Sequence, residues 1–255
     1  MARYAMAAVT VIAAVACVLS AGHEPQEATP APQPFAVVEL FTSEGCSSCP
    51  AADELLGRIV DEAKAKGRPV YALAYHVDYW NRLGWVDKLS DPAHSRRQEA
   101  YVQALQSRQV YTPQMIVDGT EQFLGSDADA AKKAIDGAVA RKPAVAFAIK
   151  AEVAAKDGVR VSFQATGAPA RAVVNVAVVE QGLETKVLHG ENAGRTLKHA
   201  NVVRVFRTVD LPADGKGTVD LTIPPAVMRK NATIIAFIQT ADDMTVRAGA
   251  SAAIP

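Results

Sequence analysis

The chain has 255 residues, of which 27 are basic and 27 acidic, so its formal net charge is zero. This balance argues against the basic surface that nucleic acids and anionic membranes attract, and we expect neither as a partner. The chain has three cysteines, which excludes a zinc site with four cysteine ligands from one chain.

The first residues have the pattern of a secretory signal peptide. Arg3 precedes an apolar run over residues 4–19 that is too short and too rich in alanine for a membrane span. We expect residues 1–22 to be removed, leaving a periplasmic or secreted protein without stable membrane insertion. Lipoprotein processing at Cys17 is the alternative. Residues 23–34 contain four prolines among polar residues and predict a tether.

Strand and helix patterns alternate over residues 35–142. Apolar runs, or alternation of apolar and polar residues, predict strands. Apolar residues three and four positions apart predict helices. In chain order we expect a strand over 35–41, a helix ending near 66, a strand over 70–77, a helix over 93–107, a hairpin through Asp118 and Gly119, and a helix over 126–140.

The pattern changes near Pro143, where the helix signals end. About eight short strand candidates follow, separated by Asp-Gly, Gly-Lys-Gly and Pro-Pro turns. That number is typical of two packed antiparallel sheets. We therefore expect an all-β, sandwich-like domain over residues 143–255.

Cys46 and Cys49 stand where the first strand gives way to the first helix. A Cys-x-x-Cys at that junction is typical of a thioredoxin-like redox site. Unpaired backbone N–H groups at a helix start stabilise a thiolate, so we predict that Cys46 is the nucleophile and Cys49 the more buried resolving thiol. A bridge across two residues closes too small a loop to stabilise the chain much, which favours reactivity over a structural role.

Three segments of the sequence resemble a family of secreted bacterial proteins of unknown function with a thioredoxin-like fold. They are residues 38–50, 76–85 and 111–115. The resemblance implies an α/β thioredoxin-like N-terminal domain over residues 35–142. It also implies a cis peptide bond before Pro113, which would pack against the disulfide. The backbone of Thr112 would then be free to bind an extended substrate.

Glu39 interrupts the first apolar strand. Burial would raise the pKa of this carboxyl and let it exchange a proton with Cys49, so we include Glu39 among the catalytic candidates. The thioredoxin superfamily usually has a buried acid six residues before the first cysteine, whereas Glu39 stands seven before Cys46. The alternative is a Glu at the solvent-facing edge of the strand, or one paired with a basic side chain.

His76, Asp78 and Trp80 follow the second strand at its carboxyl end, where ligands bind in open α/β sheets. Because His76 and Asp78 are two residues apart, we expect them to point to one face and to help bind substrate. The alternative is that His76 ends the strand and Trp80 packs a long loop. We expect residues 94–98 on a solvated helix face and no ligand role for His199.

Three functions are compatible with these residues. We favour an exported thiol-disulfide oxidoreductase that needs no cofactor or metal and acts on protein or small-molecule thiols and disulfides. The same cysteines with His76 would also suit Cu(I) or Zn(II) in an envelope metal-binding protein or copper chaperone. The third is a non-catalytic interaction protein with a structural disulfide.

Overall fold

The computed structural model describes residues 1, 31–154 and 158–255. The expected signal peptide, Cys17 and most of the expected tether lie outside these residues. The helices are α1 (Cys49–Lys66), α2 (Pro92–Ala104) and α3 (Ala128–Ala140), with short 3-10 turns η1 (Asn81–Leu83) and η2 (Arg229–Asn231). The strands are β1 (Ala36–Thr42), β2 (Val70–His76), β3 (Gln114–Val117), β4 (Glu121–Leu124), β5 (Ala146–Val153), β6 (Gly158–Thr166), β7 (Ala172–Glu180), β8 (Leu183–Lys186), β9 (Thr196–His199), β10 (Val202–Asp210), β11 (Lys216–Thr222), β12 (Ala232–Thr240) and β13 (Val246–Ala253).

The three helices begin and end at residues suited to helix termini. Pro50 lies in the first turn of α1, where its missing N–H has no cost, and Gly67 ends the helix in a left-handed conformation. The side chains of Asp91 and Asp127 accept backbone N–H groups at the starts of α2 and α3. Among the described residues no helix is both long and apolar enough to cross a membrane.

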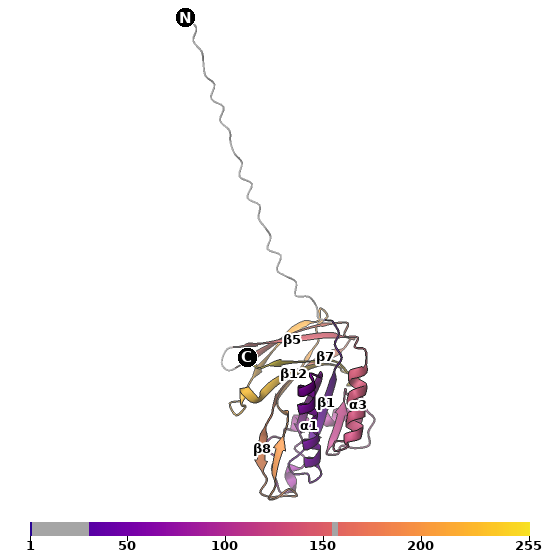
Figure 1. Ribbon diagram of the computed structural model, residues 1–255, viewed down its shortest axis with the longest axis vertical. Helices are drawn as coiled ribbons and strands as arrows, with labels where there is room; N and C mark the ends of the chain where they lie inside the picture. Colours follow the sequence, from indigo (N-terminus) through magenta and orange to yellow (C-terminus); the bar gives the residue numbers. More distant parts are fainter. Residues whose placement is uncertain (2–30, 155–157) are drawn as a thin grey trace.

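One mixed sheet takes strands from both halves of the chain, in the order β13-β12-β7-β10-β2-β1-β3-β4 (Figure 1). β1 and β2 are parallel, so Thr42 and His76 lie side by side at their carboxyl ends. β10 joins the other side of β2 through the pairing of Val202 with Ala74. Strands β11-β6-β5 form a second sheet, and β8 and β9 form a small separate ribbon.

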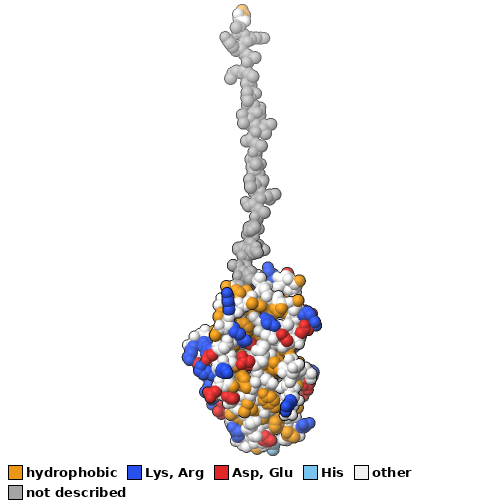
Figure 2. All heavy atoms as spheres, turned by 90° about the vertical axis from the view of Figure 1, so that its right-hand side faces the viewer, with side chains coloured by type: hydrophobic (Ala, Val, Ile, Leu, Met, Phe, Trp, Pro, Cys, Tyr) orange, Lys and Arg blue, Asp and Glu red, His pale blue; other side chains and the backbone are white. Residues whose placement is uncertain are grey.

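The large sheet is covered on both faces. Helices α1 and α3 pack against Val38 and Leu40 of β1, while Tyr101 of α2 packs with Val37 and Phe41 on the opposite face. That second cluster continues into residues of β7, β12 and β13, so one apolar core spans both halves of the chain. The strands β5, β6 and β11 pack on the outer part of the sheet through a third cluster. On the face in Figure 2, side chains of both charges are interspersed.

The predicted fold class, an α/β thioredoxin-like domain over residues 35–142 followed by an all-β sandwich over residues 143–255, is wrong. The described chain is mostly β, with three α-helices and a large mixed sheet. The reason lies in β7 and β12, whose residues are buried almost without alternation. Strands buried on both faces belong in the middle of a covered sheet and do not form the half-exposed layer of a simple sandwich.

Candidate functional site

The two cysteines lie at the start of α1, beyond the carboxyl end of β1. Both are free thiols, with 1% of Cys46 and 0% of Cys49 exposed. The Cys46 Sγ atom lies 3.2 Å from Ser48 Oγ and 3.8 Å from the carbonyl oxygen of Thr112. The thiols are therefore held by contacts from two separate segments of the chain.

The surroundings move the pKa values of the two thiols in opposite directions. A hydrogen bond from the Cys49 thiol lowers the pKa of Cys46 from 9.0 to about 6, against the opposing effect of burial and with help from Ser48 and Thr112. Burial raises the pKa of Cys49 far above its usual range, and the charges of Cys46 and Asp53 raise it further. Cys46 is therefore mainly thiolate at neutral pH, while Cys49 keeps its proton.

Thr112 contacts Cys46 through its carbonyl oxygen, and Pro113 and Trp80 adjoin Thr112. The Thr112–Pro113 peptide bond is cis, as the family resemblance implies. The indole Nε1 of Trp80 donates to Thr112 Oγ1 over 2.8 Å, and a Cβ on Gly45 would lie 3.3 Å from the Cβ of Trp80. The structure thus brings three predicted substrate-binding residues beside the predicted nucleophile.

The loop over residues 190–195 reaches the cysteine turn from the second half of the chain. Asn192 Nδ2 donates to the carbonyl oxygens of both Glu44 and Cys46, each over 2.9 Å. The backbone N–H of Ser47 donates to Glu191 Oε2, also over 2.9 Å. Arg195 in turn holds the amide oxygen of Asn192. No local sequence pattern predicts these contacts, because they link residues far apart in the chain.

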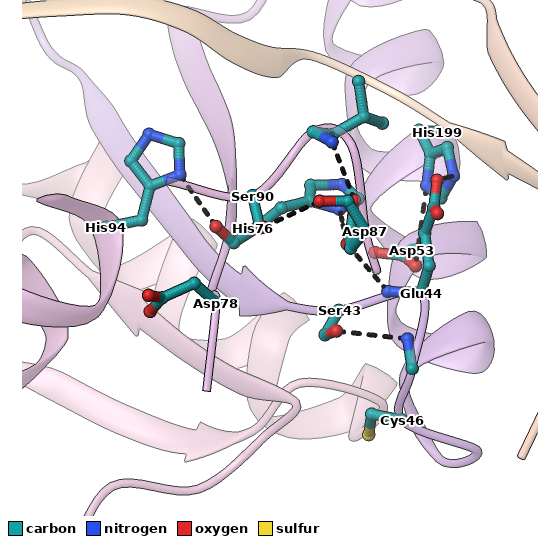
Figure 3. A network of polar contacts seen from close by, with 12 residues as sticks. Ser43, Glu44, Cys46, Asp53, His76, Asp78, Asp87, Ser90, His94 and His199 are labelled. Carbon is teal, nitrogen blue, oxygen red and sulfur yellow. Dashed lines mark hydrogen bonds and ion pairs between the residues drawn. The ribbon is translucent and has the colours of Figure 1, made fainter. Parts of the chain in front are cut away.

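Five ionisable side chains form what we call the acid–histidine cluster: Glu44, Asp53, His76, Asp87 and His199. All are buried. His76 Nδ1 donates to Asp87 Oδ2 over 2.7 Å, while the ring of His199 lies 3.3 Å from Glu44 Oε1 and 3.9 Å from Asp53 Oδ2 (Figure 3). The rings of His76 and His199 are 4.9 Å apart between centroids.

Burial and neighbouring charges compete in setting the pKa values within this cluster. Burial alone would lower the pKa of His76, but Asp87, Asp53 and Glu44 raise it above its usual value. The pKa of Asp87 is lowered because its contacts with His76 and with backbone N–H groups outweigh its burial. Burial raises the pKa of Asp53 despite the nearby His76 and His199.

Several atoms of the acid–histidine cluster have no hydrogen-bond partner. They are Glu44 Oε1, Asp53 Oδ2, His76 Nε2 and both ring nitrogens of His199. Leaving buried polar atoms unpaired costs free energy, so such a concentration at one place calls for an explanation. Within residues 31–154 and 158–255, no group of three or more His, Cys, Asp or Glu side chains is arranged to hold a metal ion.

Glu39 lies away from the thiols, contrary to the proton-exchange role expected for it. Successive residues of β1 alternate between the faces of the sheet, and Glu39 shares the α2 face with Val37 and Phe41, whereas α1 covers the other face. The Glu39 carboxylate accepts two hydrogen bonds from Arg97, at 2.5 and 2.9 Å, and one from Tyr101. This is the basic pairing that the sequence analysis held as the alternative. The acid beside Cys49 is Asp53, one turn later on α1.

His76 and Asp78 do not act together as expected. The His76 side chain enters the acid–histidine cluster, and Asp78 lies apart from it (Figure 3). The Asp78 carboxylate accepts a hydrogen bond from Ser95 on α2. The expectation of a solvated helix face over residues 94–98 also fails, because His94 and Gln98 are buried and the Arg97 side chain is only 10% exposed.

Comparison with known proteins identifies the family. The family model described as "Protein of unknown function (DUF1223)" matches residues 37–239. The chain belongs to this family. The family of unknown function expected from the sequence is thereby confirmed, although the thioredoxin-like fold expected with it is not.

Two solved structures resemble this DUF1223 chain along most of its length. Protein AGR_C_4864 from Agrobacterium tumefaciens is 30% identical, with a TM-score of 0.65, and the match covers 87% of this chain and 95% of that one. HBP35 of Porphyromonas gingivalis is 16% identical with a TM-score of 0.67, covering 88% and 76%. The second likeness shows the fold alone. No curated protein matches the chain.

Proposed function

We propose that this DUF1223 protein is a thiol-disulfide oxidoreductase that works in the periplasm or outside the cell. The arrangement that carries the proposal is two free thiols three residues apart at the start of α1, with the Thr112 carbonyl oxygen beside Cys46, in surroundings that lower the pKa of Cys46 and raise that of Cys49. A thiolate is the attacking species in disulfide exchange, and a buried neighbouring thiol can close an intramolecular disulfide. A structural bridge would need no such difference between its cysteines.

In the reducing direction, the Cys46 thiolate attacks one sulfur of a substrate disulfide. A Cys46–substrate bond forms, the substrate disulfide breaks, and the first substrate thiolate leaves and takes a proton from water. Cys49 then loses its proton and attacks Cys46 Sγ, which releases the second substrate sulfur as a thiolate. The substrate gains two electrons, the cysteine pair becomes a disulfide, and an external thiol or dithiol must reduce it again.

Thr112, Pro113 and Trp80 are the proposed substrate contacts because Thr112 lies beside Cys46 and the other two adjoin Thr112. The exposed residues nearest to it in sequence are Ser47 and Ser48. Because Cys46 is itself 1% exposed, a substrate must displace its cover, and the Ser47–Ser48 turn is the proposed place of approach.

The test is an equilibrium redox titration of the mature protein in thiol–disulfide buffers, with the oxidised fraction read by thiol labelling and mass spectrometry. We expect a reversible Cys46–Cys49 disulfide with a potential between about −120 and −270 mV, the range of known oxidants and reductants. A potential below about −300 mV would instead favour a structural bridge. Cys49→Ala should accumulate mixed disulfides with a model peptide disulfide, and Cys46→Ala should not.

A further inference from the structure

Asp53 of the acid–histidine cluster follows Cys49 by one turn of α1, and the cluster has no role in the disulfide exchange of the proposed function. We propose that Asp53 accepts the proton that Cys49 releases during disulfide closure, and that His199 is the positioning residue that makes Asp53 able to do so. The inference rests on the proposed function and deepens it. It assigns a role to a histidine from β9, in the second half of the chain.

The positions of the three side chains support this route. Asp53 follows Cys49 by one helical turn on α1, both residues are buried, and the charge of Asp53 contributes to the raised pKa of Cys49. Asp53 Oδ2 has no hydrogen-bond partner and lies 3.9 Å from His199 Nδ1. This distance exceeds a hydrogen bond, so proton transfer between them requires a bridging water or a side-chain rotation.

His199 lies between two carboxylates. Its Nε2 is 3.3 Å from Glu44 Oε1, and its Nδ1 faces Asp53. The other ionisable groups that face it are His76 of β2 and, behind it, Asp87. Trp85 Nε1 holds the second oxygen of Glu44 over 2.8 Å, which leaves Glu44 Oε1 free to face His199.

The step balances as follows. The Cys49 S–H proton passes to an Asp53 oxygen while Cys49 Sγ bonds to Cys46 Sγ. The bond between Cys46 Sγ and the substrate sulfur breaks, and the substrate leaves as a thiolate with the electron pair. Asp53 then shares the proton with His199. When an external thiol attacks Cys46 and opens the disulfide, Cys49 leaves as a thiolate and takes the proton back from Asp53.

The proposal predicts a specific pH dependence. Because the raised pKa of Cys49 makes its thiolate scarce at neutral pH, closure without an internal base must depend on hydroxide. The rate would then rise about tenfold for each pH unit, as the thiolate fraction does below its pKa. With Asp53 acting as the base, the rate should vary much less across pH 6 to 9. A purely structural histidine would leave this slope unchanged.

The experiment measures disulfide closure by rapid mixing of the full mature protein with a small aromatic disulfide whose released thiol absorbs light. We expect Asp53→Asn to slow closure about 100-fold at pH 7 and His199→Gln about tenfold, both with the steep pH slope. The first attack by Cys46 should stay within about twofold of the parent. His94→Gln is the matched control, because His94 is a buried histidine on α2 that bonds to the His76 carbonyl and has no contact with Asp53.

Each outcome decides between the ideas. A shallow parental pH slope retained in both variants overturns the proton-transfer role. A steep slope already present in the parent overturns it as well. If His199→Gln does not fold, Asp53→Asn carries the same test, since Asn nearly preserves the shape of Asp. If Cys46 in the parent never attacks the disulfide, the proposed oxidoreductase function itself fails, which the first phase reports separately.

Discussion

Replacing Cys49 by Ala should remove most of what makes Cys46 acidic. The largest contribution to the lowered pKa of Cys46 is the hydrogen bond from the Cys49 thiol, while burial opposes it. Cys49→Ala deletes the donor and leaves the burial, so the pKa of Cys46 should rise from about 6 toward the ordinary 9.0. Ser48→Ala removes a weaker contribution and should give a smaller rise.

The size of the effect on reactivity depends strongly on pH. At pH 7 a thiol with a pKa of about 6 is ~90% thiolate, and one with a pKa of 9.0 is ~1% thiolate. A less basic thiolate is also a weaker nucleophile, by roughly 16- to 32-fold over three pKa units. The net advantage of the parent is therefore about three- to sixfold at pH 7, and it grows to roughly 25- to 50-fold at pH 5.5.

The assay is alkylation of Cys46 by iodoacetamide from pH 4.5 to 9.5, with the modified peptide quantified by mass spectrometry. Because Cys46 is buried, access lowers the absolute rate, but the midpoint of the pH profile still reports its pKa. A parental midpoint above pH 8, or the same midpoint in the parent and in Cys49→Ala, would refute the reasoning.

Three further outcomes are expected. Glu39→Gln removes the charge that neutralises the nearly buried Arg97 and should lower the free energy of unfolding by about 3 kcal/mol in urea titrations, while an altered Cys46 alkylation profile would return Glu39 to the redox site. Asn192→Ala removes the side-chain donor to the Glu44 and Cys46 carbonyl oxygens and should lower the free energy of unfolding by about 1–3 kcal/mol. An unchanged free energy of unfolding would count against this contact. Zn(II) and Cu(I) titrations of the reduced protein should show no sub-micromolar site that weakens in His76→Ala, since such a site would support the metal-binding alternative.

Local sequence signals predicted the elements and the cysteine turn, because these depend on residues close together in the chain. Capping residues, helical spacing and the Asp-Gly turn lie within a few positions of the structure they determine. The assignment of Glu39 failed because successive residues of β1 point to opposite faces of the sheet. Glu39 lies on the face of Val37 and Phe41, whereas α1 covers the face of Val38 and Leu40.

The sheet order and the acid–histidine cluster could not be predicted in the same way. The hydrogen bond from Asn192 to Cys46 joins residues 146 positions apart, and no periodicity relates them. One weak signal for His199 exists, since the burial of β9 alternates and places His199 on the inward face with Leu197. The long apolar runs of β7 and β12 were also visible, and they indicate strands with two covered faces.

The pairing of β10 with β2 limits how this protein can be truncated or its redox site moved into another protein. Excising residues 35–142 as a unit would remove β10 from β2 and expose the backbone around Ala74, which pairs with Val202 and donates to the Asn201 carbonyl oxygen; an exposed strand edge can pair with another chain. The same cut would remove Asn192, which donates to the Glu44 and Cys46 carbonyl oxygens, and His199, which faces Glu44 and Asp53. A minimal redox fragment of this chain therefore has to retain the loop over residues 190–195, β9 and β10.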